Sequence, residues 1–332
     1  MTVLQGHERI TSDFLGSLAG GRLHHAWLLT GPRGVGKSTF ARLAARRLLA
    51  DAAGPPVTGE GLDVPSRHPV ASLLDAGSHP DFRQLERLEK PTTGDLARSV
   101  TVEQVRGLQA LFGSTPFLSP WRVAIIDAID DLERPAANAL LKNLEEPPAN
   151  CLFLLVSHAP ATLLPTIRSR CLTVRFDALG DADMAAALRR AVPDANDGEI
   201  AEMVASGEGS PGVALDRRGL GLAAIDDDLV RLATEGDPTN QVRSALSSKL
   251  ALKAAQPRYE LFLDRVPRHI AAVARTRSGT PLGEAIRLWE KARDLAESAV
   301  GLSLDPAAVT FELAGYVAAL ADARPAQGHA RG

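Results

Sequence analysis

Residues 31–38 read Gly-Pro-Arg-Gly-Val-Gly-Lys-Ser and satisfy the pattern G-x-x-x-x-G-K-[ST] at every position. The glycines let backbone N–H groups turn inward around phosphate oxygens, because a Cβ would hinder that approach. Lys37 can reach the outer phosphates, and the Ser38 hydroxyl can hold Mg²⁺. The motif follows a strand-like run and opens a helix-like one, which is the context that it requires. It predicts a nucleotide-binding P-loop rather than the alternative, a plain glycine turn. The predicted nucleotide-binding residues in this segment are Gly31, Pro32, Arg33, Gly34, Val35, Gly36, Lys37, Ser38 and Thr39.

A second feature of such sites is an acid at the end of a buried strand, and Asp127 ends a mostly apolar run. In P-loop ATPases an acid here holds the Mg²⁺ shell, so Asp127 and Ser38 are the predicted magnesium ligands. An ordinary strand-end acid is the alternative. Ala128 follows where many of these enzymes carry a Glu that polarises the attacking water, and aliphatic carbon cannot act as a base. Asp130 and Asp131 are expected to face solvent beyond the strand, which makes them poor substitutes.

The order of apolar and helical segments divides the chain into an α/β part and helical parts. Buried-strand patterns alternate with helical ones up to residue 177, which predicts a parallel sheet flanked by helices. After residue 178 the strand signal stops and only helical patterns follow, with a plausible linker at 235–238. The expected divisions are 1–177, 178–236, 237–324 and a disordered tail at 325–332.

Composition narrows the class of protein. The chain has 332 residues and a net charge of −3, so no overall basic excess suggests that it coats nucleic acid. Its two cysteines, Cys151 and Cys171, form neither a zinc spacing nor a disulfide framework, which favours a reducing compartment. No signal peptide opens the chain, and no apolar run approaches the roughly 18 residues of a membrane span. We expect a soluble cytoplasmic protein without a membrane partner.

Three further segments carry a specific resemblance. They are His25-Ala-Trp-Leu-Leu, the stretch Asn138–Pro148 (Asn-Ala-Leu-Leu-Lys-Asn-Leu-Glu-Glu-Pro-Pro) and Ser169-Arg170-Cys171. With the P-loop they resemble the AAA+ clamp-loader family of bacterial DNA polymerase III, and most of all its delta-prime branch, over residues 5–218. The resemblance implies an AAA+ P-loop domain, a small helical lid domain and an all-helical collar domain, in that order. It also implies the partners: gamma/tau and delta subunits in a hetero-pentamer, a sliding clamp and, indirectly, primed DNA.

The resemblance gives Arg170 a role in catalysis. In clamp loaders the arginine of Ser-Arg-Cys is an arginine finger that enters the nucleotide site of the neighbouring subunit. A fixed guanidinium there neutralises charge that develops on the transferred phosphoryl group. A surface arginine at a helix end is the alternative.

Departures from the family pattern set the expected chemistry. The stretch 51–78 lacks the four zinc-binding cysteines of many relatives, so no structural zinc is expected, and His68 and His79 alone make a weak site. Gly212 stands where ATPase subunits carry a lid arginine, and Ser157 matches the first sensor position only loosely. We expect a subunit that binds ATP or ADP with Mg²⁺ but hydrolyses ATP slowly or not at all. The alternatives are a catalytic gamma/tau-type subunit and, more distantly, a stand-alone P-loop kinase.

Overall fold

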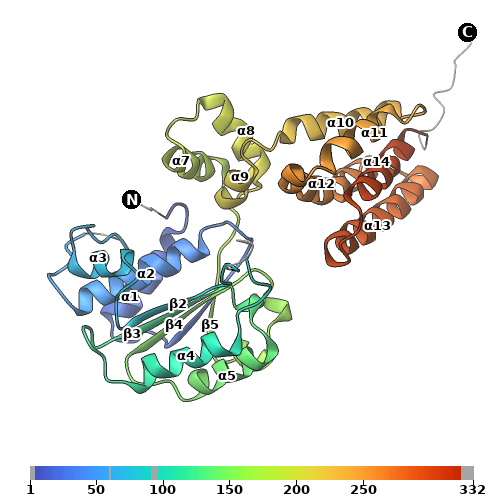
Figure 1. Cartoon of the computed structure of the whole chain (residues 1–332). Coiled ribbons are helices and arrows are strands. Elements are labelled where there is room, and N and C mark those ends of the chain that lie inside the picture. Colours follow the sequence, from blue (N-terminus) through green and yellow to red (C-terminus); the bar gives the residue numbers. More distant parts are fainter. Residues whose placement is uncertain (1–3, 60, 91–95, 323–332) are drawn as a thin grey trace, which may run out of the picture. The chain divides into compact units, whose positions relative to one another are not determined.

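The structure is a computed structural model that describes residues 4–59, 61–90 and 96–322. Two compact units divide the chain, Met1–Asp216 and Arg217–Gly332 (Figure 1). The predicted tail at 325–332 lies outside the described residues. Among the described residues, no helix is both long and apolar enough to cross a membrane.

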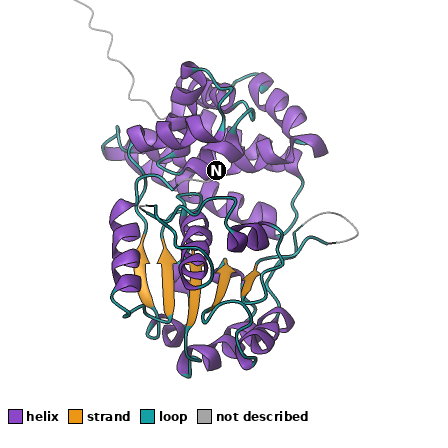
Figure 2. Cartoon of the chain, turned by 90° about the vertical axis from the view of Figure 1, so that its left-hand side faces the viewer, coloured by secondary structure: helices purple, strands orange, loops and turns teal. Residues whose placement is uncertain are grey.

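A parallel sheet forms the centre of the first unit. Its strands lie side by side (Figure 2), and their order is β2-β3-β4-β1-β5. Every pairing is parallel, and Asp127 at the end of β3 pairs with Val156 of β4. The strands are β1 (Ala26–Thr30), β2 (Phe82–Leu85), β3 (Arg122–Asp127), β4 (Cys151–Ser157) and β5 (Leu172–Arg175). The parallel α/β sheet predicted from the sequence is confirmed.

Helices cover both faces of this sheet (Figure 1). Because successive strand side chains point to opposite faces, β1 supplies two hydrophobic clusters. Trp27 and Leu29 join one cluster, and Leu28 joins the other. One face carries α1 (Glu8–Ala19), α2 (Lys37–Ala52) and α3 (Pro69–Asp75). The other carries α4 (Val102–Gly113) and α5 (Arg134–Glu145), with α6 (Pro165–Arg168) against α5. Two short 3₁₀ turns follow strand ends, η1 (Ile129–Asp131) and η2 (Pro160–Thr162).

A small group of helices completes the first unit. It consists of α7 (Asp181–Ala191), α8 (Asp197–Gly207) and α9 (Pro211–Arg217). Asn196 and Glu199 form a capping box that starts α8. Met184 of α7 and Ala214 of α9 are fully buried in the same cluster as Trp27. We call the helices α7 to α9 the lid helices.

The second unit is entirely helical where it is described. Its elements are α10 (Leu222–Glu235), α11 (Gln241–Leu250), η3 (Lys253–Ala255), α12 (Gln256–Ala274), α13 (Gly279–Gly301) and α14 (Pro306–Asp322). It has its own core, which includes Ile225, Phe262 and Leu313. Helix α10 packs against α14 and so belongs to this unit, although its residues fall within the predicted 178–236 segment. The three-part division at 177 and 236 stays a prediction.

Candidate nucleotide-binding site

The P-loop connects β1 to α2 in a conformation that depends on glycine. Gly31, Gly34 and Gly36 have φ of 137°, 76° and 114°, in the region that L side chains rarely adopt. A Cβ on Gly31 would stand 2.1 Å from the carbonyl oxygen of Phe176. The loop therefore needs glycine at all three positions for its backbone angles, and at Gly31 also for its close approach to the segment after β5.

Lys37 is the first residue of α2, and its side chain is only 2% exposed. Its Nζ donates hydrogen bonds to the carbonyl oxygens of Gly31 at 2.6 Å and Pro32 at 2.5 Å. Burial lowers the pKa of Lys37 to about 8, against the opposing pull of the Asp130 and Asp127 carboxylates. A buried ammonium inside a glycine loop is the arrangement that binds phosphate, so Lys37 and the P-loop glycines fit the phosphate groups of a nucleotide.

A cavity of about 320 Å³ opens beside the loop. One wall is the P-loop segment from Gly34 to Thr39. Most of the remaining lining is apolar, with Leu4 from the N-terminal segment and Leu179, Ala187 and Leu215 from around the lid helices. A ligand with an anionic end and a flat apolar end matches this lining, which is the chemistry of a nucleotide.

A second cavity, about 740 Å³, shares Gly34, Ser38, His158 and Gly212 with the first. Arg33, Ser38, Asp127 and Ala128 all line it, so the structure brings the two predicted magnesium ligands to one space. Among the described residues, no group of three or more His, Cys, Asp or Glu side chains could hold a metal by itself. Magnesium at Ser38 and Asp127 would therefore take its other ligands from phosphate oxygens and water, as is usual for this ion.

The prediction for Asp130 and Asp131 was wrong. Asp130 is half-buried, and its carboxylate accepts hydrogen bonds from Ser157 Oγ at 2.8 Å and from the His158 backbone N–H at 2.6 Å. Asp131 is also half-buried and pairs with Arg87 at 3.1 Å. The turn η1 bends the chain back across the end of β4 instead of leading it into solvent. Asp130 thus holds the end of the strand beside the P-loop.

His158 is a site residue that sequence reasoning missed. It follows β4, and it lines both cavities. Desolvation and the positive charge of Lys37 lower the pKa of His158, while Asp130 and Asp127 oppose that shift. The available signal was its position at the carboxyl end of a strand next to the P-loop strand, where ligands of open α/β sheets bind.

The lid helices contact the P-loop directly through two glycines. The Gly212 N–H at the start of α9 donates to the carbonyl oxygen of Gly34 at 2.9 Å. A Cβ on Gly212 would lie 2.7 Å from Gly34 Cα, so only glycine permits this approach. Gln5 adds a second tie, donating to Asp183 of α7 at 3.0 Å and accepting from Arg190 at 3.0 Å. At Gly212 the lid helices therefore meet the P-loop through backbone atoms.

Arg170 lies between α6 and β5 and lines neither of the two cavities. Its side chain is 34% exposed and pairs with Glu145 at the end of α5, at 2.9 Å. The guanidinium also donates to the Thr166 carbonyl oxygen at 2.9 Å. Arg170 therefore lies outside both cavities at the P-loop, with part of its side chain exposed.

The two histidines considered for zinc make backbone contacts. His68 Nδ1 accepts from the Val70 N–H at 3.2 Å and begins α3, and its Nε2 lies 3.1 Å from the Pro55 carbonyl oxygen. His79 Nδ1 accepts from the Asp81 N–H at 3.2 Å. Local structure accounts for both ring nitrogens of His68, whereas His79 Nε2 is buried without a hydrogen-bond partner. The expected absence of zinc stays a prediction.

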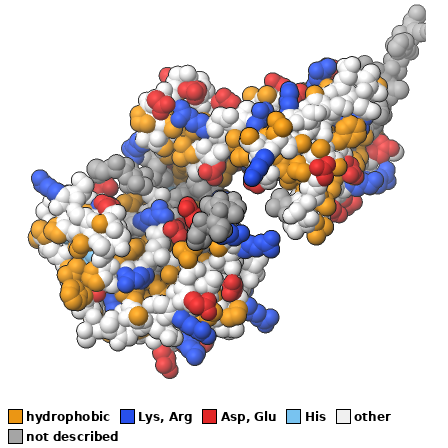
Figure 3. Space-filling view, viewed as in Figure 1, with side chains coloured by type: hydrophobic (Ala, Val, Ile, Leu, Met, Phe, Trp, Pro, Cys, Tyr) orange, Lys and Arg blue, Asp and Glu red, His pale blue; other side chains and the backbone are white. Residues whose placement is uncertain are grey.

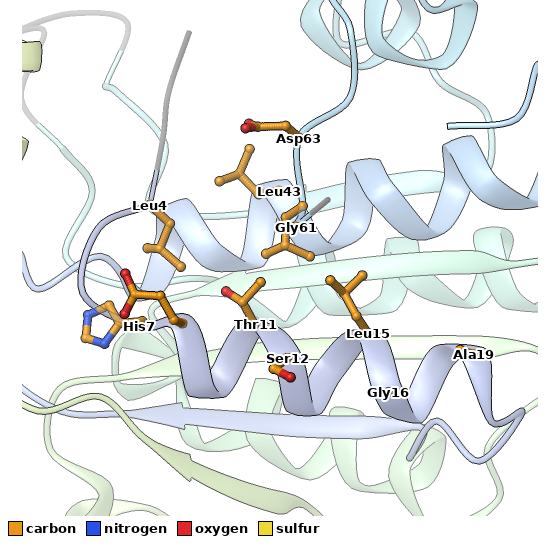
Figure 4. Close-up of a pocket in the computed structure, with 12 residues that line it drawn as sticks. Leu4, His7, Thr11, Ser12, Leu15, Gly16, Ala19, Leu43, Gly61 and Asp63 are labelled. Carbon is orange, nitrogen blue, oxygen red and sulfur yellow. The ribbon is translucent and has the colours of Figure 1, made fainter. Parts of the chain in front are cut away.

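A further cavity of about 680 Å³ lies between α1, α2 and the segment around Gly61 (Figure 4). Leu4, Leu15 and Leu43 project into it, and its described lining residues include no Lys or Arg. Its size alone would make it a candidate site. Without a cation or a glycine loop it does not suit phosphate, so the nucleotide site stays at the P-loop.

A family model described as DNA polymerase III, delta subunit, matches residues 6–180. The chain belongs to this family. The clamp-loader resemblance identified from the motifs is thus confirmed, and with it the predicted AAA+ class of fold.

The curated relatives of this chain are named as different subunits of DNA polymerase III: delta', gamma and tau. It is 37% identical over 215 residues to DNA polymerase III subunit delta' of Pseudomonas aeruginosa, covering 63% of the chain and 60% of the relative. It is 34% identical to subunit gamma of Buchnera aphidicola, covering 54% of the chain and 45% of the relative. Subunit tau of Salmonella typhimurium is 36% identical, with 52% and 25% covered. The chain thus spans at most 60% of the length of these relatives.

Among solved structures, a gamma subunit-related protein of DNA polymerase III from Thermotoga maritima is similar with a TM-score of 0.45. The two chains are 13% identical, and the match covers 95% of this chain and 99% of the other.

Proposed function

We propose that this chain is a delta-prime-type subunit of a bacterial, cytoplasmic clamp loader, which helps to place a sliding clamp on primed DNA. Its proposed partners are gamma/tau and delta subunits in a hetero-pentamer. Family membership and the similarity to a protein named delta' support the proposal. The observation that carries it is the site itself, in which the phosphate-binding parts are present and Ala128 follows Asp127 in place of a Glu.

In this proposal the P-loop binds ATP or ADP with Mg²⁺. The backbone N–H groups from Arg33 to Gly36 and the Lys37 ammonium hold phosphates, and Ser38 and Asp127 hold the metal. The bound Mg²⁺ supplies charge neutralisation at the phosphates. Ala128, 4% exposed, stands where a base would activate water, and its methyl group cannot accept a proton.

Slow hydrolysis follows from the missing groups. Gly212 brings a backbone N–H to the P-loop instead of a guanidinium, so no lid charge faces the phosphates at that position. Losing one electrostatic group typically costs about 10² to 10³ in rate. Losing a base as well lowers the rate further, so we expect the chain to bind nucleotide and turn it over far more slowly than a motor subunit.

The chemical contribution of the chain is then made in trans. Arg170 is half-buried at a turn whose backbone is held by hydrogen bonds, and part of its side chain stays exposed. Such a guanidinium can neutralise charge on a phosphoryl group bound by a neighbouring subunit. We assign Arg170 this role of arginine finger.

Contact with primed DNA is proposed to be indirect. On the face viewed in Figure 3, Lys and Arg side chains are interspersed with Asp and Glu rather than gathered in one basic stripe. A protein that tracks a DNA backbone by itself usually presents such a stripe.

A catalytic gamma/tau-type subunit is the second candidate, because several relatives carry those names and the P-loop is complete. The two candidates differ in turnover by the purified chain. Hydrolysis of ATP at the rate of an AAA+ motor would favour the second. Sedimentation with and without the other clamp-loader subunits distinguishes both candidates from a stand-alone kinase, because a kinase would not bind those subunits and its sedimentation would not change.

The deciding experiment is reconstitution of the complete clamp loader with its clamp and primed DNA. Arg170→Ala is expected to lower clamp loading strongly, and Lys37→Ala only modestly. Arg168→Ala is the matched control, because Arg168 is an exposed neighbour on the same turn. The opposite order of effects for Arg170 and Lys37 would mean that this chain is itself a motor.

A further inference from the structure

The contact between Arg170 and Glu145 joins the two segments that most resemble the clamp-loader family. Glu145 is the last residue of α5, and Arg170 follows α6. All of β4 lies between them in the sequence, yet Arg170 Nη2 and Glu145 Oε1 are 2.9 Å apart. The fold therefore brings a carboxylate to the proposed finger.

Two different groups hold the guanidinium. Nη2 pairs with the Glu145 carboxylate, and Nη1 donates to the Thr166 carbonyl oxygen at 2.9 Å. Nη1 also lies 3.4 Å from Ser169 Oγ. An arginine has five N–H donors in a rigid plane, so two anchors fix the plane and leave other donors to face a partner.

The position of Glu145 costs its helix some stability. A carboxylate in the last turn of a helix opposes the helix dipole, and Glu146 adds a second negative charge. Pro147 and Pro148 follow and stop the helix here, so Glu145 stays at its end. Cations near the helix end relieve this cost: Lys142 lies in the same last turn, and Arg170 pairs directly with Glu145.

We infer that Glu145 is a positioning residue for Arg170, which holds the guanidinium in the orientation that a neighbouring phosphoryl group requires. The inference rests on the proposed arginine finger. Both side chains are substantially exposed, 34% for Arg170 and 47% for Glu145, so the ion pair is weak and does not compete strongly with a phosphate. It restricts the side-chain conformations of Arg170 before the partner arrives.

The competing role for the same contact is a lock. If Glu145 kept Arg170 away from the partner, removing the carboxylate would raise the hydrolysis rate of the neighbouring subunit. A positioning residue has the opposite effect, because an unanchored guanidinium samples many rotamers and spends less time in the productive one.

The test uses the complete reconstituted clamp loader with clamp and primed DNA, and measures kcat and KM for ATP. Glu145→Ala should lower kcat by about three- to ten-fold and leave KM within about two-fold, because the lost interaction acts in the transition state. Glu145→Gln should recover most of the rate, since its amide oxygen accepts the same hydrogen bond. Glu146→Ala, the adjacent exposed carboxylate, is the matched control and should behave as wild type.

A double variant separates positioning from a general structural effect. Glu145→Ala in an Arg170→Ala background should cause no further loss, because nothing remains to be positioned. A further loss, or a Glu145→Ala rate equal to or above wild type while Arg170→Ala is impaired, would overturn the inference and leave the finger standing. A wild-type rate for Arg170→Ala would instead overturn the proposed finger itself.

Discussion

Replacing Gly212 by alanine should loosen the lid helices from the P-loop. The added Cβ would lie 2.7 Å from Gly34 Cα and 3.1 Å from the Gly34 carbonyl oxygen. Both are backbone atoms, so no side chain can rotate out of the way. An ordinary carbon contact is about 3.5–4.0 Å, and the two backbones must therefore separate by roughly 1 Å.

That separation breaks the hydrogen bond between the Gly212 N–H and the Gly34 carbonyl oxygen, which measures 2.9 Å. A bond of this kind contributes about 0.5–1.5 kcal/mol. Alanine in place of glycine inside a helix returns about 0.5–1 kcal/mol, so global stability should change little. The opening of the lid contact should instead become about two- to twelve-fold more frequent. Gln5 still ties α7 to the N-terminal segment, which keeps the loosening local.

Hydrogen exchange followed by mass spectrometry measures this opening. Peptides that contain residues 33–36 and the start of α9 should exchange faster in Gly212→Ala, with the rest of the sheet unchanged. Gly107→Ala is the control, because Gly107 lies inside α4 and an added Cβ there meets nothing within 4 Å. Equal exchange of the P-loop peptides in wild type and Gly212→Ala would refute the claim that the glycine contact holds the lid.

Two further predictions concern buried charges. Because burial lowers the pKa of Lys37 to about 8, the free chain loses this positive charge above pH 8, whereas bound phosphate favours the charged form. Nucleotide binding near pH 9 should therefore be accompanied by uptake of close to one proton. The binding enthalpy measured by calorimetry should then differ between buffers with different ionisation enthalpies. Equal binding enthalpies in these buffers would contradict this prediction. Asp81 is 3% exposed and accepts hydrogen bonds from three consecutive N–H groups, those of residues 117–119, at 2.7, 2.7 and 3.0 Å. Burial alone would raise the pKa of Asp81, but these bonds and His79 lower it overall. The ionised carboxylate therefore stabilises the fold at pH values above the ordinary Asp pKa, and this stabilisation is lost as the pH falls through the lowered pKa of Asp81. Asp81→Asn should lower the free energy of unfolding, measured with urea at pH 7, by about 1.5–3 kcal/mol. The control is Asp227→Asn at an exposed position, which should stay within about 0.5 kcal/mol of wild type. Equal stability of the two variants would contradict the role given to the Asp81 hydrogen bonds.

The P-loop could be predicted from the sequence because its chemistry is local. Glycines at fixed spacing, a strand before and a helix after are all encoded within a few residues of Lys37. The strand that ends at Asp127 was equally readable, because a strand buried on both faces has a continuous apolar sequence.

The rest of the site depends on contacts between distant segments. Asp130 looked like a solvent-facing acid because nothing in its own neighbourhood shows that η1 turns toward Ser157. His158 carries no motif and becomes a site residue only because β4 lies beside β1. The contact of Gly212 with Gly34 likewise joins segments whose proximity comes from the packing of the lid helices.

The two described units have separate hydrophobic clusters, one set built on the sheet and the other on α10 to α14. Since the clusters share no residue, loss of one core need not remove apolar contacts from the other, and the chain can unfold in two cooperative steps. A ligand stabilises only the cooperative step that destroys its site. Nucleotide bound at the P-loop would therefore raise the melting temperature of the sheet-containing unit and leave that of the helical unit unchanged. The shift would identify which unfolding transition belongs to which unit.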